Sequence, residues 1–345
     1  MKLLVYVPLL TPRIKYVFSF IFNDILKTEI GFSVNIREFV QSELPKFCYA
    51  AQPIGGELFF KSTGLLLEHK IAEQEIKTTT FGDAKVPFAV QKSALPFDVF
   101  AATFYFLSRY EEYLAAGNQK SMPYPAESSL QYHLGLLELP VIDGWALILK
   151  NMLLKQFPSL SFNKKQFLFQ PLYSAYPPAK NSRRNVFANA VDYLRSFVQN
   201  ETSKHTEKLT AIRQAITGLQ AHNPAESSAL LIPSPDHRHY FDTAMLMPKS
   251  YLKQTKSNSG NDYSMYYKNQ PGFRAGTCSP FAWYDLQLDK KTRLIVHPVA
   301  TTDMALLHNK STETLLLQLN ELLDHVKLVN GHFYFLSLCN DIRPQ

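Results

Sequence analysis

Cysteine is scarce in this sequence of 345 residues, which contains only Cys48, Cys278 and Cys339. The three lie far apart and no two form a Cys-x-x-Cys pair, so the sequence supports neither a disulfide framework nor a cysteine zinc cluster. A chain of this size without disulfides is typical of a reducing compartment. We therefore expect a cytoplasmic protein.

Long apolar runs are also missing. No stretch approaches the roughly 20 residues that a transmembrane helix needs, so we expect no membrane span. The first apolar segment, residues 3–10, contains Pro8 and is not followed by a small-residue cleavage site. We interpret it as a β-strand rather than a signal peptide.

Long clusters of one charge are absent as well, although the formal net charge is +7. The basic residues occur in small groups, such as 183–184, 249–256 and 290–293, with acidic residues between the groups. Without a basic tail or a known reader motif, this pattern indicates solvated loops more strongly than nucleic-acid binding. A weak nucleic-acid binder is therefore our third choice of function.

What the sequence does contain is an alternation of strand and helix patterns. Segments rich in β-branched and aromatic residues occur at 3–7, 32–36, 58–61, 166–169, 229–232, 293–297 and 332–338. Helical patterns occur at 98–113, 143–157, 185–199, 207–219 and 312–330. The last of these has Ser311 as N-cap and Gly331 as C-cap. Such an alternation predicts an α/β fold.

The chain is long enough for two domains. The best candidate boundary is the segment 158–165, where a helical pattern ends at Pro158 and a strand pattern follows. We therefore predict an N-terminal α/β domain at 1–165 and a second domain at 166–345. In α/β folds, chemistry is usually carried by residues that directly follow the strands.

Six short strings then occur in a fixed order along the chain. They are YVPLLTPR at 6–13, PIGGEL at 53–58, LPFDVF at 95–100, SRYEEY at 108–113, DYSM at 262–265 and QPGFRAGTCSPF at 270–281. Together they make the chain resemble the long polysaccharide deacetylase-like proteins of Bacteroidetes, in which an N-terminal α/β domain precedes a NodB-type deacetylase domain. The resemblance covers most of 1–172 and 260–345. It implies that the second domain is a truncated, distorted (β/α) barrel.

The resemblance also implies which catalytic residues have been lost. Enzymes of this type use paired aspartates, two metal-binding histidines, an arginine that orients the catalytic aspartate and a late histidine as acid, and the metal activates water. In this sequence Ser174 and Tyr176 stand at the positions of the aspartates, and Cys339 stands at that of the acid. Of the expected set, Arg274 alone is kept. The resemblance therefore implies a degenerate member without deacetylase activity.

One other group could hold a metal. His237 and His239 have the His-x-His spacing that places two imidazoles on one face of an extended segment, with Asp236 and Asp242 nearby. The prolines before them indicate a surface loop with solvated histidines, and we favour that interpretation. We expect no cofactor; zinc or another divalent metal would bind only if the metal site had been rebuilt.

A candidate pocket is expected where the strands of the second domain end. Its residues are Tyr263, Arg274, Trp283, His297 and Asp303. Aromatic faces can stack on sugar rings, and a histidine oriented by a carboxylate can act as a base. The competing interpretation is that the aromatic residues pack the core, that His297 satisfies backbone groups, and that Arg274 is structural and paired with a carboxylate such as Asp262 or Asp303.

The function that we expect is a non-catalytic, carbohydrate-related binding or scaffolding protein, whose partner is a glycan or another protein. The alternative is a metal-dependent carbohydrate N-deacetylase with a rebuilt metal site. The sequence leaves the ligand and the oligomeric state open.

Overall fold

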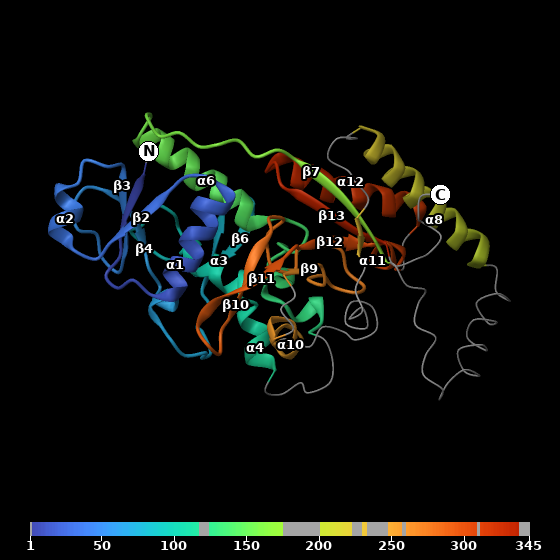
Figure 1. Cartoon of the computed structure of the whole chain (residues 1–345), viewed down its shortest axis with the longest axis horizontal. Helices are drawn as coiled ribbons and strands as arrows, with labels where there is room; N and C mark the ends of the chain where they lie inside the picture. Colours follow the sequence, from blue (N-terminus) through green and yellow to red (C-terminus); the bar gives the residue numbers. More distant parts are fainter. Residues whose placement is uncertain are drawn as a thin grey trace.

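The computed structural model of the chain describes residues 2–116, 124–174, 201–222, 230–232, 248–256, 260–308 and 311–337. Helices and strands alternate over most of these ranges, which confirms the α/β class predicted from the sequence. Figure 1 shows one parallel sheet on the left, a second parallel sheet on the right, and strands β10 and β11 between them.

The first sheet consists of four parallel strands in the order β2-β1-β3-β4. The strands are β1 (Leu3–Tyr6), β2 (Ile30–Ser33), β3 (Lys46–Ala50) and β4 (Leu58–Lys61). Helix α1 (Pro12–Phe18) follows β1 and continues as the π-helix η1 (Ser19–Ile25). The predicted strand 32–36 was placed too late, because Asn35 is the N-cap of helix α2 (Ile36–Gln41).

A buried helical hairpin packs against this sheet. Helix α3 (Val99–Leu107) is buried along its whole length, and its N-cap Asp98 accepts a hydrogen bond from Ala101 N. The chain then turns at Arg109, whose backbone is left-handed with φ 54°, and continues as helix α4 (Tyr110–Ala115). The single helix predicted over 98–113 is therefore two helices, and the turn between them places Arg109 in the protein interior.

The remaining elements before residue 165 are short, except for the last. They are η2 (Leu65–Leu67), the antiparallel hairpin of β5 (Thr78–Phe81) and β6 (Ala84–Pro87), η3 (Ala126–Ser128), α5 (Leu130–His133) and α6 (Val141–Gln156). Helix α6 corresponds to the helix predicted over 143–157.

The main hydrophobic core extends beyond residue 165. Strands β10 (Phe281–Asp285) and β11 (Lys290–Val296) form an antiparallel pair, and β9 (Asn261–Asp262) lies parallel to β11. Trp283 and Val296 are buried in the same cluster as Leu3 and Phe104. The Tyr16 hydroxyl also donates to the Ala282 carbonyl over 2.8 Å. These later strands are therefore packed together with the first 160 residues.

The second parallel sheet has the strand order β12-β13-β7-β8. Its strands are β7 (Leu168–Ser174), β8 (Leu230–Ile232), β12 (Val299–Thr302) and β13 (His332–Ser337). The helices that accompany it are α8 (Glu201–His222), α11 (Asp303–Leu307) and α12 (Thr312–Leu328), and α10 (Lys249–Lys256) lies against β11 instead. Helix α12 begins after Ser311, as predicted.

Each face of the second sheet is covered in a different way. Phe333 and Phe335 point from β13 into a cluster with the apolar sides of α8 and α12. Tyr334 and Leu336, which alternate with them, pack on the other face against the loop that contains Tyr263. In the described part of the chain, the four strands form a row that has β12 and β8 at its ends.

Candidate functional site

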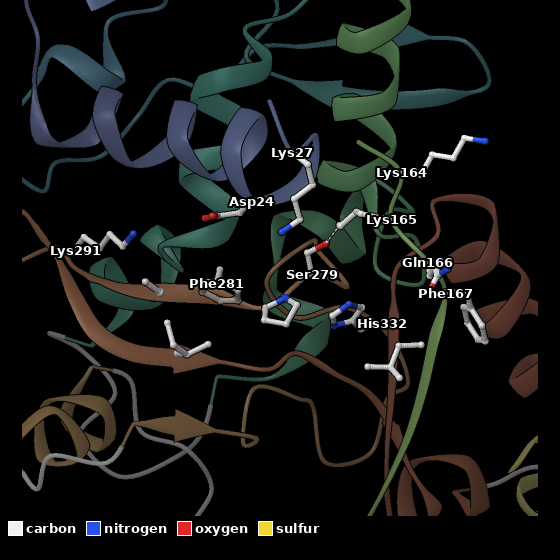
Figure 2. A pocket seen from close by; sticks show the side chains of 14 residues that line it. Asp24, Lys27, Lys164, Lys165, Gln166, Phe167, Ser279, Phe281, Lys291 and His332 are labelled. Carbon is white, nitrogen blue, oxygen red and sulfur yellow. Dashed lines mark hydrogen bonds between the residues drawn. The ribbon is translucent and has the colours of Figure 1, made fainter. Parts of the chain in front are cut away.

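A pocket of about 590 Å³ lies at the amino ends of β7 and β13, between the second sheet and the first 30 residues of the chain (Figure 2). Residues from five segments line it: Asp24, Lys27, Lys164, Lys165, Gln166, Phe167, Leu168, Ser279, Pro280, Phe281, Ala282, Lys291, Ile295 and His332. The apolar members come mainly from β10 and from the start of β7. The polar members include four lysines and only one carboxylate.

Lys165 is the best anchored of these lysines. Its Nζ donates to Ser279 Oγ over 2.6 Å and lies 3.6 Å from Asp143 Oδ1. The Asp143 carboxylate, at the start of α6, is itself held by the Thr277 hydroxyl (2.5 Å) and by Cys278 N (3.0 Å). Ser279 donates to Asp143 as well. Because Ser279 takes only one of the three Nζ donors of Lys165, others remain to face the pocket.

Lys27 and Lys291 approach the same region from other elements. Burial raises the pKa of the Asp24 carboxyl, and the positive charges of Lys291, Lys27 and Lys165 oppose that rise. Lys27 follows the π-helix η1 and has a left-handed backbone with φ 52°, which is uncommon for a residue other than glycine. Figure 2 shows Lys27 extending toward Ser279 and Lys165, whereas Lys164 points away from them.

The fifth basic residue of the pocket, His332, is part of a chain of hydrogen bonds. Its Nδ1 lies 3.1 Å from the Tyr334 hydroxyl, and the same hydroxyl lies 3.0 Å from Nδ1 of His297. The other ring nitrogen of His297 is 2.9 Å from Asn261 Oδ1. The chain thus links the pocket to the region of β9.

Both histidines of this chain are neutral at physiological pH. Burial lowers the pKa of His297 to about 4, and the nearby His332 lowers it further. Burial likewise lowers the pKa of His332 to about 4, with a further contribution from Lys165. Neutral imidazoles each carry one donor and one acceptor, so the direction of every hydrogen bond in the chain is restricted.

The structure places the residues of the sequence-predicted pocket in several different environments. Trp283 lies in the main core, between Tyr113 and Tyr251. His297 stacks on Tyr263 at a centroid distance of 4.5 Å, and both are partly buried. His297 is held by Tyr334 and Asn261, neither of which is a carboxylate.

Asp303, the carboxylate considered as its partner, lies at the carboxyl end of β12, at the start of α11. It is fully buried, and its Oδ2 accepts a hydrogen bond from Ser337 Oγ (3.1 Å) at the end of β13. Its Oδ1 accepts from Met304 N over 2.7 Å. At this edge of the second sheet, Asp303 therefore links two neighbouring strands.

Arg274 is inside the protein, in a pair with a carboxylate. Its Nε and Nη2 donate to the two oxygens of Glu112 over 2.9 and 2.6 Å, and its Nη1 donates to the Tyr266 carbonyl. The carboxylate is thus Glu112 rather than Asp262 or Asp303. The oxygens of Asp262 are bound by Tyr251, Gln254 and Ser264.

Arg109 completes this buried ionic cluster. Its Nε donates to Glu112 over 2.8 Å, and its Nη2 donates to Glu111 and to the Tyr267 hydroxyl. Burial alone would raise the pKa of the Glu112 carboxyl, but the charges of Arg274 and Arg109 outweigh this effect and lower that pKa. Glu112 is therefore an ionised carboxylate shared by two buried guanidinium groups.

Several sequence-predicted residues fall outside the described parts of the chain. They are Tyr176, Asp236, His237, His239, Asp242 and Cys339. Ser174 is described as the last residue of β7, paired with Ile232 of β8. Across the described ranges, no three His, Cys, Asp or Glu side chains converge as metal ligands would. None of the helices in those ranges has the length and the apolar content that a bilayer crossing requires.

The sequence analysis did not find the lysine pocket, because its residues are spread from Asp24 to His332. Lys164 and Lys165 were noted only as the start of a strand, and Lys290 to Arg293 only as a small basic group. The unusual backbone of Lys27 has no sequence signature. Only the strand topology brings these lysines to one place.

Comparison with known proteins extends this description for the first part of the chain. Residues 3–158 match the model of a family of unknown function, DUF7033. That range contains the first sheet, the helical hairpin α3–α4 and helix α6. No curated protein and no solved structure matches the chain.

Proposed function

We propose that this chain is a non-catalytic, carbohydrate-related binding protein, similar in its second half to polysaccharide deacetylases but without their chemistry. In this proposal, the strands of the sheet β12-β13-β7-β8 correspond to part of the barrel of that family. The position of Arg274 is the observation that supports it most directly. This arginine would orient a catalytic aspartate in an active member, and here it forms a two-fold hydrogen-bonded pair with Glu112.

The Arg274–Glu112 pair is not placed for catalysis. A general base must come within hydrogen-bond reach of the proton that it abstracts. Glu112 is 2% and Arg274 3% exposed, and the lowered pKa of Glu112 makes it a weak base. The pair is therefore better suited to hold the loop of Tyr266 and Tyr267 against α4 than to act on a substrate.

The lysine pocket supports the binding part of the proposal. Its volume of about 590 Å³ lies within the usual range for small-molecule sites, roughly 300–1,000 Å³. Phe167, Phe281 and Ile295 supply apolar surface, while Gln166 and Asp24 supply groups that can bond to hydroxyls. Apolar surface combined with a few polar side chains is what a sugar ring needs.

A binding screen together with an activity assay tests the proposal. We expect the purified full chain to bind at least one saccharide in a panel of neutral, amino and acidic sugars. We also expect no release of acetate from N-acetylated oligosaccharides, with or without added zinc. Failure to bind any saccharide, or acetate release that depends on the protein, would overturn the proposal.

Elemental analysis tests the same proposal against the metal-enzyme alternative. The proposal requires no metal, so the purified chain should hold no stoichiometric zinc, cobalt or nickel. About one ion per chain, lost in His237→Ala or His239→Ala, would instead favour a deacetylase with a rebuilt metal site.

A further inference from the structure

The lysine pocket has an excess of positive charge at its centre. Lys27, Lys165 and Lys291 all act on the single carboxylate of Asp24, and Lys27 and Lys165 also act on His332. Three lysines beside one aspartate leave two positive charges without a nearby counter-charge among the residues that line this region. A phosphate monoester carries close to two negative charges at neutral pH, which matches that excess.

Lysine is also the appropriate residue type for such a group. Its ammonium is a point charge with three donors, typical of phosphate sites, whereas carboxylates are more often bound by the planar fork of an arginine. Lys165 is only 13% exposed and is held by Ser279 and Asp143, so its position is fixed before a ligand arrives. Lys27 extends toward it from the opposite wall (Figure 2).

The hydrogen-bond chain determines what His332 offers to a ligand. Asn261 Oδ1 can only accept, so Nε2 of neutral His297 carries the proton and its Nδ1 accepts from the Tyr334 hydroxyl. That hydroxyl has a single proton, so Nδ1 of His332 must donate to it. Because neutral imidazole has only one N–H, Nε2 of His332 is left as an acceptor, which suits a sugar hydroxyl.

We propose that this pocket binds a phosphorylated sugar, with the phosphate between Lys27, Lys165 and Lys291 and a sugar hydroxyl donating to Nε2 of His332. The inference rests on the proposed function, because it takes the ligand to be a saccharide. It adds the chemical class of that saccharide and the residues that recognise each part of it.

Calorimetric titration of the full chain with three probes tests the inference: glucose 1-phosphate, glucose and inorganic phosphate. We expect glucose 1-phosphate to bind about tenfold or more tightly than either of the other two, because charge-assisted hydrogen bonds add to the contacts of the sugar. Added salt should weaken glucose 1-phosphate more than glucose.

Two lysine variants of the same pocket provide a matched comparison. Lys27→Gln should weaken glucose 1-phosphate about tenfold, whereas Lys164→Gln, whose side chain points away from the other lysines, should change it less than about twofold. Both lysines are exposed, so neither change should affect folding. Equal effects of the two variants would overturn the inference.

The outcomes separate this inference from the proposed function. Glucose that binds as tightly as glucose 1-phosphate would overturn the phosphate assignment and leave saccharide binding intact. Inorganic phosphate that binds as tightly as glucose 1-phosphate would overturn the assignment of a phosphorylated sugar. Absence of binding by every saccharide of the wider panel would overturn the proposed function as well.

Discussion

At the scale of single residues, the Tyr334 hydroxyl joins two histidines that lie on different strands. His297 follows β11 and His332 begins β13, and each has a pKa of about 4 instead of about 6.5. Protonation of either ring would replace its acceptor nitrogen by a donor and place a positive charge beside Lys165 or the other histidine. The folded state therefore excludes protons that the unfolded chain would bind.

This proton exclusion predicts a loss of stability in mild acid. An unfolded histidine takes up a proton below about pH 6.5, whereas the folded one does so only near pH 4, so the stabilising contribution is present above pH 6.5 and is lost as the pH falls toward 4. Between pH 7 and pH 5 the free energy of unfolding should fall by about 2 kcal/mol per histidine. Urea unfolding at the two pH values measures this difference.

The variant His297→Gln isolates one of the two contributions. It should be less stable than the wild type at pH 7 but should lose about 2 kcal/mol less on going to pH 5. His133→Gln, a change at an exposed histidine of α5, should follow the wild-type pH dependence. An unchanged pH dependence in His297→Gln would contradict the assignment of a low pKa to His297.

At the scale of elements, the Arg109–Glu112–Arg274 cluster joins the turn between α3 and α4 to the loop before β10. Arg109 reaches the cluster because its left-handed backbone ends α3 and reverses the chain. Gly272, with φ 134°, allows the loop to approach helix α5 and its neighbours so closely that an added Cβ would lie 2.6 Å from the Leu137 carbonyl oxygen. The cluster and the glycine together fix how the two segments meet.

Removal of Arg274 should therefore destabilise the protein without affecting the lysine pocket. In Arg274→Ala, the buried carboxylate of Glu112 keeps only Arg109 as a partner, and loss of one member of a buried ion pair costs about 3–5 kcal/mol. Arg293→Ala, at an exposed position of β11, should change the free energy of unfolding by less than about 0.5 kcal/mol. Urea denaturation distinguishes the two, and wild-type stability of Arg274→Ala would contradict a structural role.

The elements differ in how well they could be predicted from the sequence. The strands at 3–7, 58–61 and 332–338 and the helix after Ser311 were found because their periodicity and caps are local signals. The strand β3 (Lys46–Ala50) was missed, and the break at Arg109 gave no signal because nothing in the local sequence requires a left-handed arginine. The pairing of Arg274 with Glu112 and the lysine pocket depend on contacts between residues more than 100 positions apart.

At the scale of the whole molecule, one core serves both the first 160 residues and the segment that contains β10 and β11. Phe281, Trp283 and Tyr284 are at most 1% exposed in that core, and aromatic side chains bury roughly 150–250 Å² each. Residues 1–165, predicted from the sequence as an independent domain, contain only part of this core.

A fragment of residues 1–165 should therefore fold poorly on its own. It would expose the apolar surfaces that Phe281, Trp283 and Tyr284 cover, so we expect strong binding of an apolar dye and a broad thermal transition. The full chain, measured under the same conditions, should bind little dye and unfold at a higher temperature. A fragment that unfolds as sharply as the full chain, at the same temperature, would show that 1–165 is an independent domain.

The strand order β12-β13-β7-β8 has a consequence for the timing of folding during synthesis. Strand β7 is made early, yet its partner β13 begins at His332, more than 150 residues later, and β13 also separates β7 from β12. The first sheet can pair as soon as residue 61 has left the ribosome, since all its strands are close in sequence. The second sheet must wait for its last central strand, so β7 and β8 would spend most of translation with an open edge, and their pairing should be the slow step.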